Sequence, residues 1–119
     1  MRIINDVETY WNSNPCGATS YFNCADKKAA FKAIEKERYE HQAGILRYGR
    51  FGSFKDKRVL EIGCGIGTDG IQFAKNGAIY TGVDLTEAAV NVSKERFRLF
   101  GQKGEITKID AEKLPFRDN

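Results

Sequence analysis

The sequence has few of the residues that bind metals or crosslink small folds. It contains one histidine, His41, and three cysteines, Cys16, Cys24 and Cys64, whose spacing includes no pair typical of a zinc site. An odd and small number of cysteines in 119 residues also argues against a disulfide scaffold. We therefore expect free thiols in a reducing compartment and no metal site.

Long apolar runs and a strong charge imbalance are also absent. No stretch approaches the roughly 20 apolar residues of a membrane span, and residues 1–8 lack the apolar region of a signal peptide. The formal net charge is only +3, and Lys and Arg form no stripe with interleaved aromatics, which argues against a nucleic-acid surface. The sequence predicts a cytoplasmic protein that binds neither a membrane nor nucleic acid.

Hydrophobic residues make up 41% of the chain, enough for one core in one domain at this length. Residues 1–25 read as irregular, with a turn-rich cluster at residues 12–17. The aromatic residues Tyr10 and Trp11 in this segment have two possible roles. They could pin the segment onto the core, or they could close over a ligand as part of a lid.

From Asp26 the composition changes to strong helix formers, and Asp26 itself is a suitable N-cap. The pattern predicts one helix as far as about Tyr48, ended by Gly49 in the left-handed conformation. Its charged residues are expected on the solvated face. His41 could carry protons but is better explained as a surface or packing residue, and Tyr39 has a stronger claim to reach a ligand.

Three short strand-like runs then alternate with helical segments. Strands are predicted at residues 58–62, 78–83 and 105–109, and the first is nearly continuously apolar, as a central parallel strand should be. The helices between them have suitable caps and stops: Thr68 or Asp69, Asn76–Gly77, Thr86 and Gly101. Right-handed crossovers give the strand order 3-2-1. The predicted fold is a Rossmann-like α/β parallel sheet in three layers, preceded by an N-terminal helix.

Acidic residues stand at the carboxyl ends of the three strands, at Glu61, Asp84 and Asp110. In an open α/β sheet this rim is where ligands bind. The loop at residues 63–67 has glycine at alternating positions, so a ligand can approach its bare backbone. Asp84 can accept hydrogen bonds from both hydroxyls of a ribose, and the pattern therefore predicts a nucleoside-binding βαβ unit.

The residues beside these acids extend the predicted nucleoside site. Leu85 would pack against a purine face. Asp110 would accept the exocyclic amine of adenine, and the Ala111 amide would contact a ring nitrogen.

The loop composition argues against a dinucleotide. A pyrophosphate-binding G-x-G-x-x-G motif requires glycine at the position of Thr68, and the flanking Glu61 and Asp69 would repel phosphates. These acids suit a ligand that carries an ammonium and a sulfonium. Cys64 is expected to be a small side chain whose backbone lines the ligand, rather than a nucleophile. An NAD-type oxidoreductase stays open as the less favoured alternative.

Three segments carry a resemblance to a known family. Residues 59–67 (VLEIGCGIG) resemble the first motif of class I S-adenosylmethionine-dependent methyltransferases, and residues 82–85 (GVDL) resemble their second-strand motif. Residues 110–116 (DAEKLPF) resemble the segment that follows their third strand. The resemblance covers about residues 55–119. It implies S-adenosylmethionine as cofactor, S-adenosylhomocysteine as product, and methyl transfer to an acceptor.

The resemblance also implies roles for individual residues. Glu61 and the 63–67 backbone would hold the methionine part, Asp84 the ribose, and Leu85 with Asp110 and Ala111 the adenine. The predicted cofactor contacts are Glu61, Gly63, Cys64, Gly65, Gly67, Thr68, Asp69, Asp84, Leu85, Asp110, Ala111 and Glu112. The predicted lid or substrate residues are Tyr10, Trp11 and Tyr39. No catalytic residue is assigned, and the lid-like start favours a small-molecule acceptor.

The family usually has a seven-stranded sheet, so the resemblance predicts that residues 55–119 are the first half of its domain, truncated before strand 4. Residues 1–54 would form an N-terminal loop and helix that serve as a cap or lid. The first strand would then have an unpaired edge, which predicts self-association through that edge or by segment exchange. Such a half is expected to be inactive alone, and a non-catalytic cofactor-binding fragment is the alternative interpretation.

Overall fold

A computed structural model describes residues 24–110 of the chain. The predictions made for Tyr10, Trp11, Cys16, Ala111 and Glu112 lie outside the described residues. Among residues 24–110, no helix combines the length and the apolar character needed to cross a bilayer.

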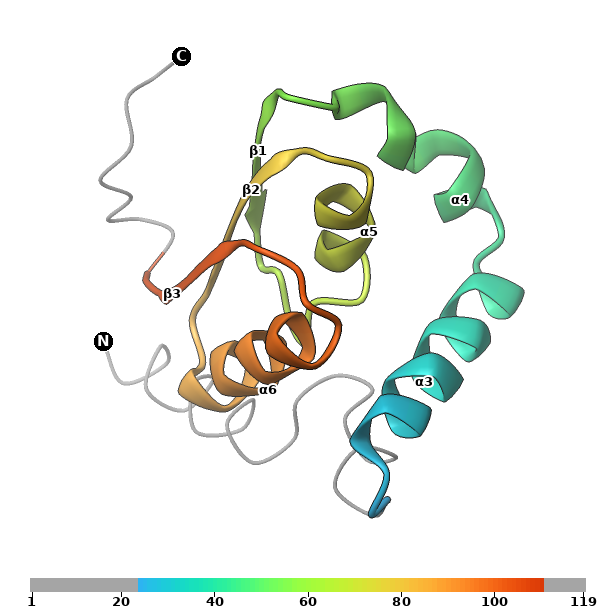
Figure 1. Cartoon of the computed structure of the whole chain (residues 1–119), viewed down its shortest axis with the longest axis vertical. Coiled ribbons are helices and arrows are strands. Elements are labelled where there is room, and N and C mark those ends of the chain that lie inside the picture. Colours follow the sequence, from blue (N-terminus) through green and yellow to red (C-terminus); the bar gives the residue numbers. More distant parts are fainter. Residues whose placement is uncertain (1–23, 111–119) are drawn as a thin grey trace.

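Three parallel strands form one open sheet (Figure 1). The strands are β1 (Arg58–Ile62), β2 (Ile79–Asp84) and β3 (Glu105–Lys108), and β2 lies between the other two. Helix α5 (Gly70–Lys75) connects β1 to β2, and helix α6 (Glu87–Leu99) connects β2 to β3. The predicted 3-2-1 order is confirmed, with β2 displaced by one residue from its predicted bounds and β3 ending one residue early.

Both crossover helices cover the same face of the sheet and enclose the main core. Tyr80 of β2 and Ile106 of β3 pack there against Ile71 of α5 and Phe97 of α6. The Tyr80 and Phe97 rings stack with their centroids 5.5 Å apart. Aromatic and β-branched side chains therefore fix the helices on the sheet, and with them the loop that joins β1 to α5.

The nearly continuous apolar run of β1 resembles a central strand, but its side chains are not all buried. Leu60 and Ile62 are 43% and 55% exposed, and Ile79 of the neighbouring strand is 57% exposed. Successive side chains of a strand point to opposite faces, and α5 and α6 cover only one of them. The side chain of Val59 points to the opposite face of the strand and packs against the core.

The predicted single helix from Asp26 to Tyr48 is two helices. Helix α3 (Lys27–His41) begins at the N-cap Asp26, whose carboxylate accepts the Ala29 amide at 3.1 Å, as predicted. The helix is broken at Gln42, and α4 (Gly44–Gly49) follows. Gly49 is the last residue of α4, and Arg50 takes the left-handed conformation that was predicted for Gly49. A 3-10 turn, η1 (Phe51–Phe54), then leads to β1.

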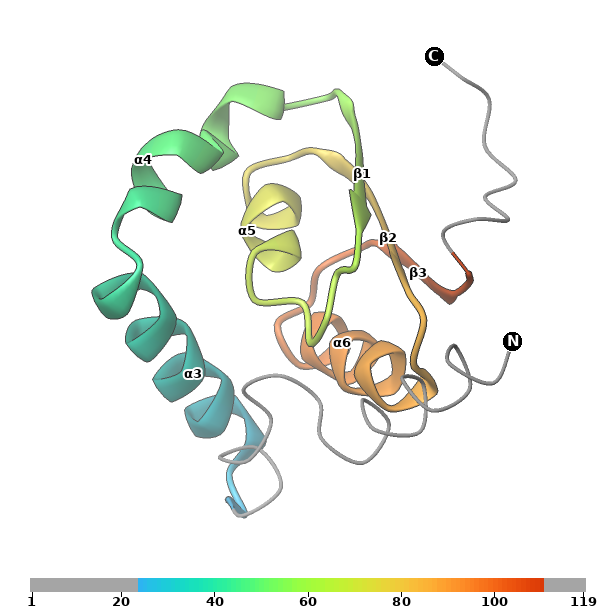
Figure 2. The ribbon, with the colours of Figure 1, turned by 180° about the vertical axis from the view of Figure 1, so that it is seen from behind.

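Helix α3 packs beside α6 and the loop that follows β1, and Figure 2 shows this arrangement from behind. Phe31 and Ile34 of α3 form a second buried cluster with Ile66 of the loop and Val92 of α6. Helix α3 is thus part of the folded body and borders one side of the glycine loop.

Candidate cofactor site

The glycine loop leaves β1 through three residues in the left-handed region. Gly63, Gly65 and Gly67 have φ angles of 76°, 56° and 81°. The amides of Gly63 and Cys64 both donate to the Val83 carbonyl, at 2.8 and 3.0 Å, which ties the start of the loop to β2. A chain of L-residues with side chains would be strained along this path, so the alternating glycines are required by the backbone itself.

The glycines differ in what surrounds them. A Cβ built on Gly63 or Gly65 would meet nothing within 4 Å, whereas one on Gly67 would lie 2.5 Å from the Ser93 Oγ of α6. Gly67 therefore permits close packing of the loop against α6. Gly63 and Gly65 instead present bare backbone to open space, which is the arrangement that a ligand pressed against the loop requires.

Asp84, at the end of β2, is joined directly to this loop. One carboxylate oxygen accepts the Gly65 amide at 2.8 Å, and the other accepts the Thr86 amide at 3.1 Å and the Thr86 hydroxyl at 3.3 Å. A carboxylate has about four acceptor positions, so one remains for a ligand hydroxyl. The Ile109 amide donates to the Asp84 carbonyl at 2.9 Å, which places Asp110 beside the end of β2. Leu85 is half-buried.

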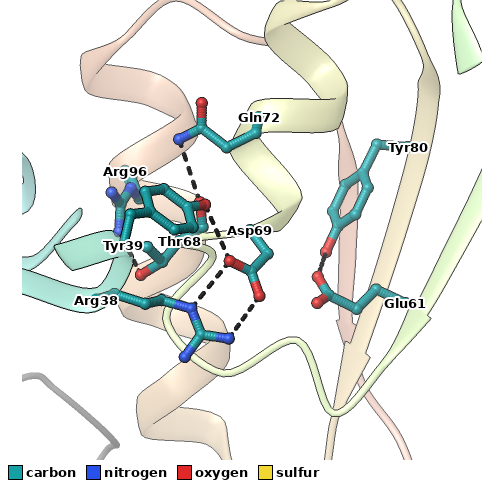
Figure 3. A network of polar contacts seen from close by, with 8 residues as sticks. All are labelled: Arg38, Tyr39, Glu61, Thr68, Asp69, Gln72, Tyr80 and Arg96. Carbon is teal, nitrogen blue, oxygen red and sulfur yellow. Dashed lines mark hydrogen bonds and ion pairs between the residues drawn. The ribbon is translucent and has the colours of Figure 1, made fainter. Parts of the chain in front are cut away.

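Glu61 forms a pair with Tyr80 that sequence analysis did not identify. The Tyr80 hydroxyl donates to Glu61 Oε1 at 2.6 Å (Figure 3). Burial is the main cause that raises the pKa of Glu61 to about 7; the charges of Asp69 and Asp84 act in the same direction, and the hydrogen bond from Tyr80 acts against them. Burial beside Glu61 also raises the pKa of Tyr80, so its hydroxyl keeps its proton. A cation bound beside Glu61 would favour the ionised carboxylate.

A sequence signal for this pair existed in the glycines around Tyr80. Gly82 pairs with Glu61 in the sheet, and a Cβ on Gly82 would lie 2.6 Å from the Tyr80 hydroxyl. Gly70 is closer still, because its Cβ would lie 2.3 Å from that hydroxyl. Glycines at both positions make room for a polar group between β1, β2 and α5.

The Asp69 side chain does not cap helix α5, although its position predicts that it would. Asp69 is the N-cap residue of α5, but its side chain makes no capping hydrogen bond, which corrects the predicted capping role. Both carboxylate oxygens face α3 instead. Arg38 forms a bidentate pair with them: its Nε donates to Oδ1 at 2.9 Å and its Nη2 donates to Oδ2 at 2.6 Å (Figure 3). The Tyr39 hydroxyl also lies 2.9 Å from Oδ1.

Arg96 of α6 is a second residue that sequence analysis missed. Its side chain is 1% exposed, and its Nη1 donates to the Thr68 hydroxyl at 2.9 Å. The available signal was a cationic residue between Ser93 and Phe97, on the apolar face of the predicted helix. A charge in that position requires polar partners inside the fold.

The thiol of Cys64 lies inside the loop region and is buried. Burial, together with the charges of Asp84 and Glu61, raises its pKa to about 12. The thiol is therefore neutral at physiological pH and is a poor nucleophile. No group of three or more potential metal ligands gathers anywhere in residues 24–110.

These features fit S-adenosylmethionine. The open backbone at Gly63 and Gly65 would accommodate a ligand at close range, Asp84 would give a ribose a carboxylate acceptor, and Glu61 would give an ammonium a negative charge. The fold and this rim of acids define a Rossmann-like domain that binds a nucleoside cofactor.

Comparison with known proteins identifies the family. Residues 59–119 match the model of a methyltransferase domain family, so the chain belongs to that family. It is a class I S-adenosylmethionine-dependent methyltransferase sequence, and S-adenosylmethionine is the cofactor of this class.

Two curated relatives match different lengths of the chain. The ubiquinone biosynthesis O-methyltransferase of Dechloromonas aromatica is 42% identical over 62 residues, which are 52% of this chain and 27% of that protein. The phthiotriol/phenolphthiotriol dimycocerosates methyltransferase of Mycobacterium tuberculosis is 41% identical over a 90-residue alignment that covers 71% of this chain and 33% of that protein. The chain thus spans a third or less of the length of these relatives.

A solved structure supports the fold. Magnesium protoporphyrin IX methyltransferase from Synechocystis PCC 6803, crystallised with bound S-adenosylmethionine, matches with a TM-score of 0.62 and 18% identity. The match covers 93% of this chain and 56% of that one.

Proposed function

We propose that this chain forms the cofactor-binding part of an S-adenosylmethionine-dependent methyltransferase, and that the whole protein methylates a small molecule. The observation that carries the proposal is the open space at Gly63 and Gly65, bordered by the end of β2 with Asp84. Membership of the methyltransferase family supports it independently.

In this proposal the residues of the chain bind and orient the cofactor. Asp84 accepts a hydrogen bond from one ribose hydroxyl at its remaining acceptor position while it keeps the Gly65 amide in place. Ionised Glu61, held by Tyr80, attracts the ammonium of the methionine part. Leu85 and Asp110 border the adenine. When bound, S-adenosylmethionine supplies an activated methyl group on a sulfonium, and the protein contributes orientation and exclusion of water.

A small-molecule acceptor is supported by the relatives, two of which are named for ubiquinone biosynthesis and for dimycocerosate lipids. Because this chain spans at most a third of those relatives, we assign the acceptor pocket and any general base to the wider protein. The chain alone is then expected to bind cofactor without turnover. Free thiols at Cys24 and Cys64 suit a cytoplasmic location.

We also propose that this chain self-associates. Leu60, Ile62 and Ile79 form an exposed apolar patch on the sheet face that α5 and α6 leave uncovered. In the described part of the chain, β1 pairs only with β2, so its other edge carries unpaired backbone groups. Unpaired edges and exposed apolar patches both promote association.

Calorimetry tests the cofactor assignment directly. S-adenosylhomocysteine should bind the chain with measurable heat, and NAD should not. Asp84→Ala should weaken binding by more than tenfold, since charged hydrogen bonds contribute about 1.5–3 kcal/mol each. Glu40→Ala, which removes an exposed carboxylate from α3, is the matched control and should leave affinity unchanged. Equal affinity in the Asp84 variant and the wild type would refute the ribose role.

A further inference from the structure

Helix α3 makes polar contacts to two consecutive loop residues, Thr68 and Asp69. Arg38 and Tyr39 of α3 together occupy both carboxylate oxygens of Asp69. The Arg38 and Asp69 side chains are 35% and 18% exposed, so solvent screens this bidentate pair only partly. Asp69 is thereby held toward α3 at the end of the loop.

Thr68 is held from three sides. Its carbonyl lies 3.2 Å from the Tyr39 hydroxyl and accepts the Gln72 side-chain amide at 3.3 Å. Its hydroxyl accepts a hydrogen bond from Arg96 at 2.9 Å. The same Gln72 amide contacts the Glu35 carboxylate of α3, so α5 and α3 are bridged next to the loop.

Arg96 links this loop residue to α3 through the interior. Its Nη2 donates to the Phe31 carbonyl at 3.3 Å, and its guanidinium lies 4.8 Å from the centre of the Phe31 ring. Burial lowers the pKa of Arg96 to about 10, because the charged form of the guanidinium is less stable away from water. A buried charge that makes these contacts joins α3, α6 and the loop in one fixed arrangement.

The contacts all lie at the α3 end of the loop, whereas Gly63 and Gly65 open to free space at the other end. We propose that α3 is a clamp that fixes the glycine loop in its ligand-ready conformation, with Arg38, Tyr39 and Arg96 as positioning residues. None of these three side chains needs to touch the cofactor. The clamp acts by ordering, before a ligand arrives, a loop with three left-handed glycines, and preorganisation of this kind raises affinity.

If α3 acts as a clamp, cofactor binding and α3 docking must each favour the other. If docked α3 raises the affinity of the loop for its ligand, the ligand must stabilise docked α3 by the same factor. This coupling rests on the proposed function, because it requires that the loop binds S-adenosylmethionine or S-adenosylhomocysteine. The ordering of the loop by α3 does not require it.

The first test therefore uses no ligand. Amide hydrogen exchange is measured in the wild type, in Arg38→Ala and in Lys36→Ala, a control that removes an exposed cation from the same helix. Arg38→Ala should speed exchange at Gly65 and Gly67 by about tenfold while β2 amides stay protected. Lys36→Ala should match the wild type. Equal loop exchange in the two variants would overturn the clamp.

Tyr39→Phe covers the case in which Arg38→Ala undocks α3 completely. It deletes only the hydroxyl and keeps the ring, whose centroid lies 6.2 Å from that of Phe51. Faster loop exchange in this variant, with thermal stability close to that of the wild type, supports the clamp. Unchanged loop exchange in Tyr39→Phe, alongside an undocked Arg38→Ala, contradicts it.

The second test adds S-adenosylhomocysteine. Arg38→Ala should bind about tenfold more weakly at a temperature where it is fully folded, and Arg38→Lys should fall between, because lysine keeps the charge but loses the bidentate geometry. S-adenosylhomocysteine should also slow α3 exchange in the wild type. Unchanged affinity in folded Arg38→Ala overturns the coupling. A wild type that binds no S-adenosylhomocysteine refutes the proposed function, and the ligand-free exchange still decides the clamp.

Discussion

Glycine is required at Gly65 and at Gly70 for opposite physical reasons. A side chain at Gly65 would project into open space, whereas one at Gly70 would meet the Tyr80 hydroxyl at 2.3 Å and the ring carbon that bears it at 2.4 Å. Gly65→Ala should cost about 1–2 kcal/mol for its left-handed backbone and abolish S-adenosylhomocysteine binding. Gly70→Ala should cost about 3 kcal/mol by overpacking.

Chemical denaturation and calorimetry on both variants check this contrast. The folded fraction of Gly70→Ala should bind more weakly than the wild type but should still bind, since the substitution displaces the Tyr80 hydroxyl that holds Glu61 and does not enter the open side of the loop. If Gly65→Ala bound S-adenosylhomocysteine normally, the ligand would not lie against that glycine.

Glu61 should make stability depend on pH. Its pKa rises from 4.5 to about 7 on folding, so the folded protein binds more protons than the unfolded chain between these values. Stability is then highest below pH 4.5 as far as this group is concerned, and it falls as pH rises through 7. The total loss is on the order of 3 kcal/mol.

Glu61→Gln isolates this effect because the amide cannot ionise. Between pH 5 and pH 8 the free energy of unfolding should fall less in the variant than in the wild type, because the Glu61 contribution is absent. At pH 8 the variant should be the more stable of the two. Urea denaturation across that range measures the difference. Parallel pH profiles for the two proteins would show that Glu61 is not desolvated.

At the scale of elements, the break between α3 and α4 offers a simple test of helix propensity. A Cβ on Gly44 would meet the Tyr48 ring at an ordinary 3.7 Å, while one on Gly49 would meet the Phe51 ring at 3.1 Å. Gly44→Ala should therefore stabilise the chain by about 0.5–1 kcal/mol. Gly49→Ala, the matched control, should not. Thermal melts that rank the two variants in the reverse order would contradict this.

The order and type of elements could be predicted, but their tertiary partners could not. Local patterns sufficed for β1, for the Thr86 cap of α6 and for the Asn76–Gly77 stop of α5, because these features depend on neighbouring residues. The helix break at Gln42 was missed because glutamine is itself a good helix former.

The site shows the same division. Gly63, Gly65 and Asp84 were identifiable because their spacing follows from the backbone path of a strand and turn. The pairing of Asp69 with Arg38 joins residues 31 positions apart, and local sequence rules assigned Asp69 to a cap instead. Glu61 with Tyr80 likewise depends on sheet register, which single-strand patterns do not supply.

At the scale of the whole molecule, the exposed apolar patch of Leu60, Ile62 and Ile79 predicts association. Light scattering at tens of micromolar should give a mass above that of a monomer. Leu60→Lys should lower that mass, because it places a charge in the exposed patch. Leu46→Lys is the matched control, since Leu46 is 53% exposed but lies on α4. A monomeric wild type, or equal effects of the two substitutions, would contradict association through the sheet.

The central claim is that the Gly63–Gly67 loop and the end of β2 bind S-adenosylmethionine, and an NMR titration tests it most directly. Amide resonances of a ¹⁵N-labelled chain are followed as S-adenosylhomocysteine is added, with NAD as the comparison ligand. We expect saturable shifts concentrated at Gly63, Gly65 and the residues next to Asp84, and none with NAD. Saturable shifts that spare the loop, or shifts with NAD alone, would contradict the assignment.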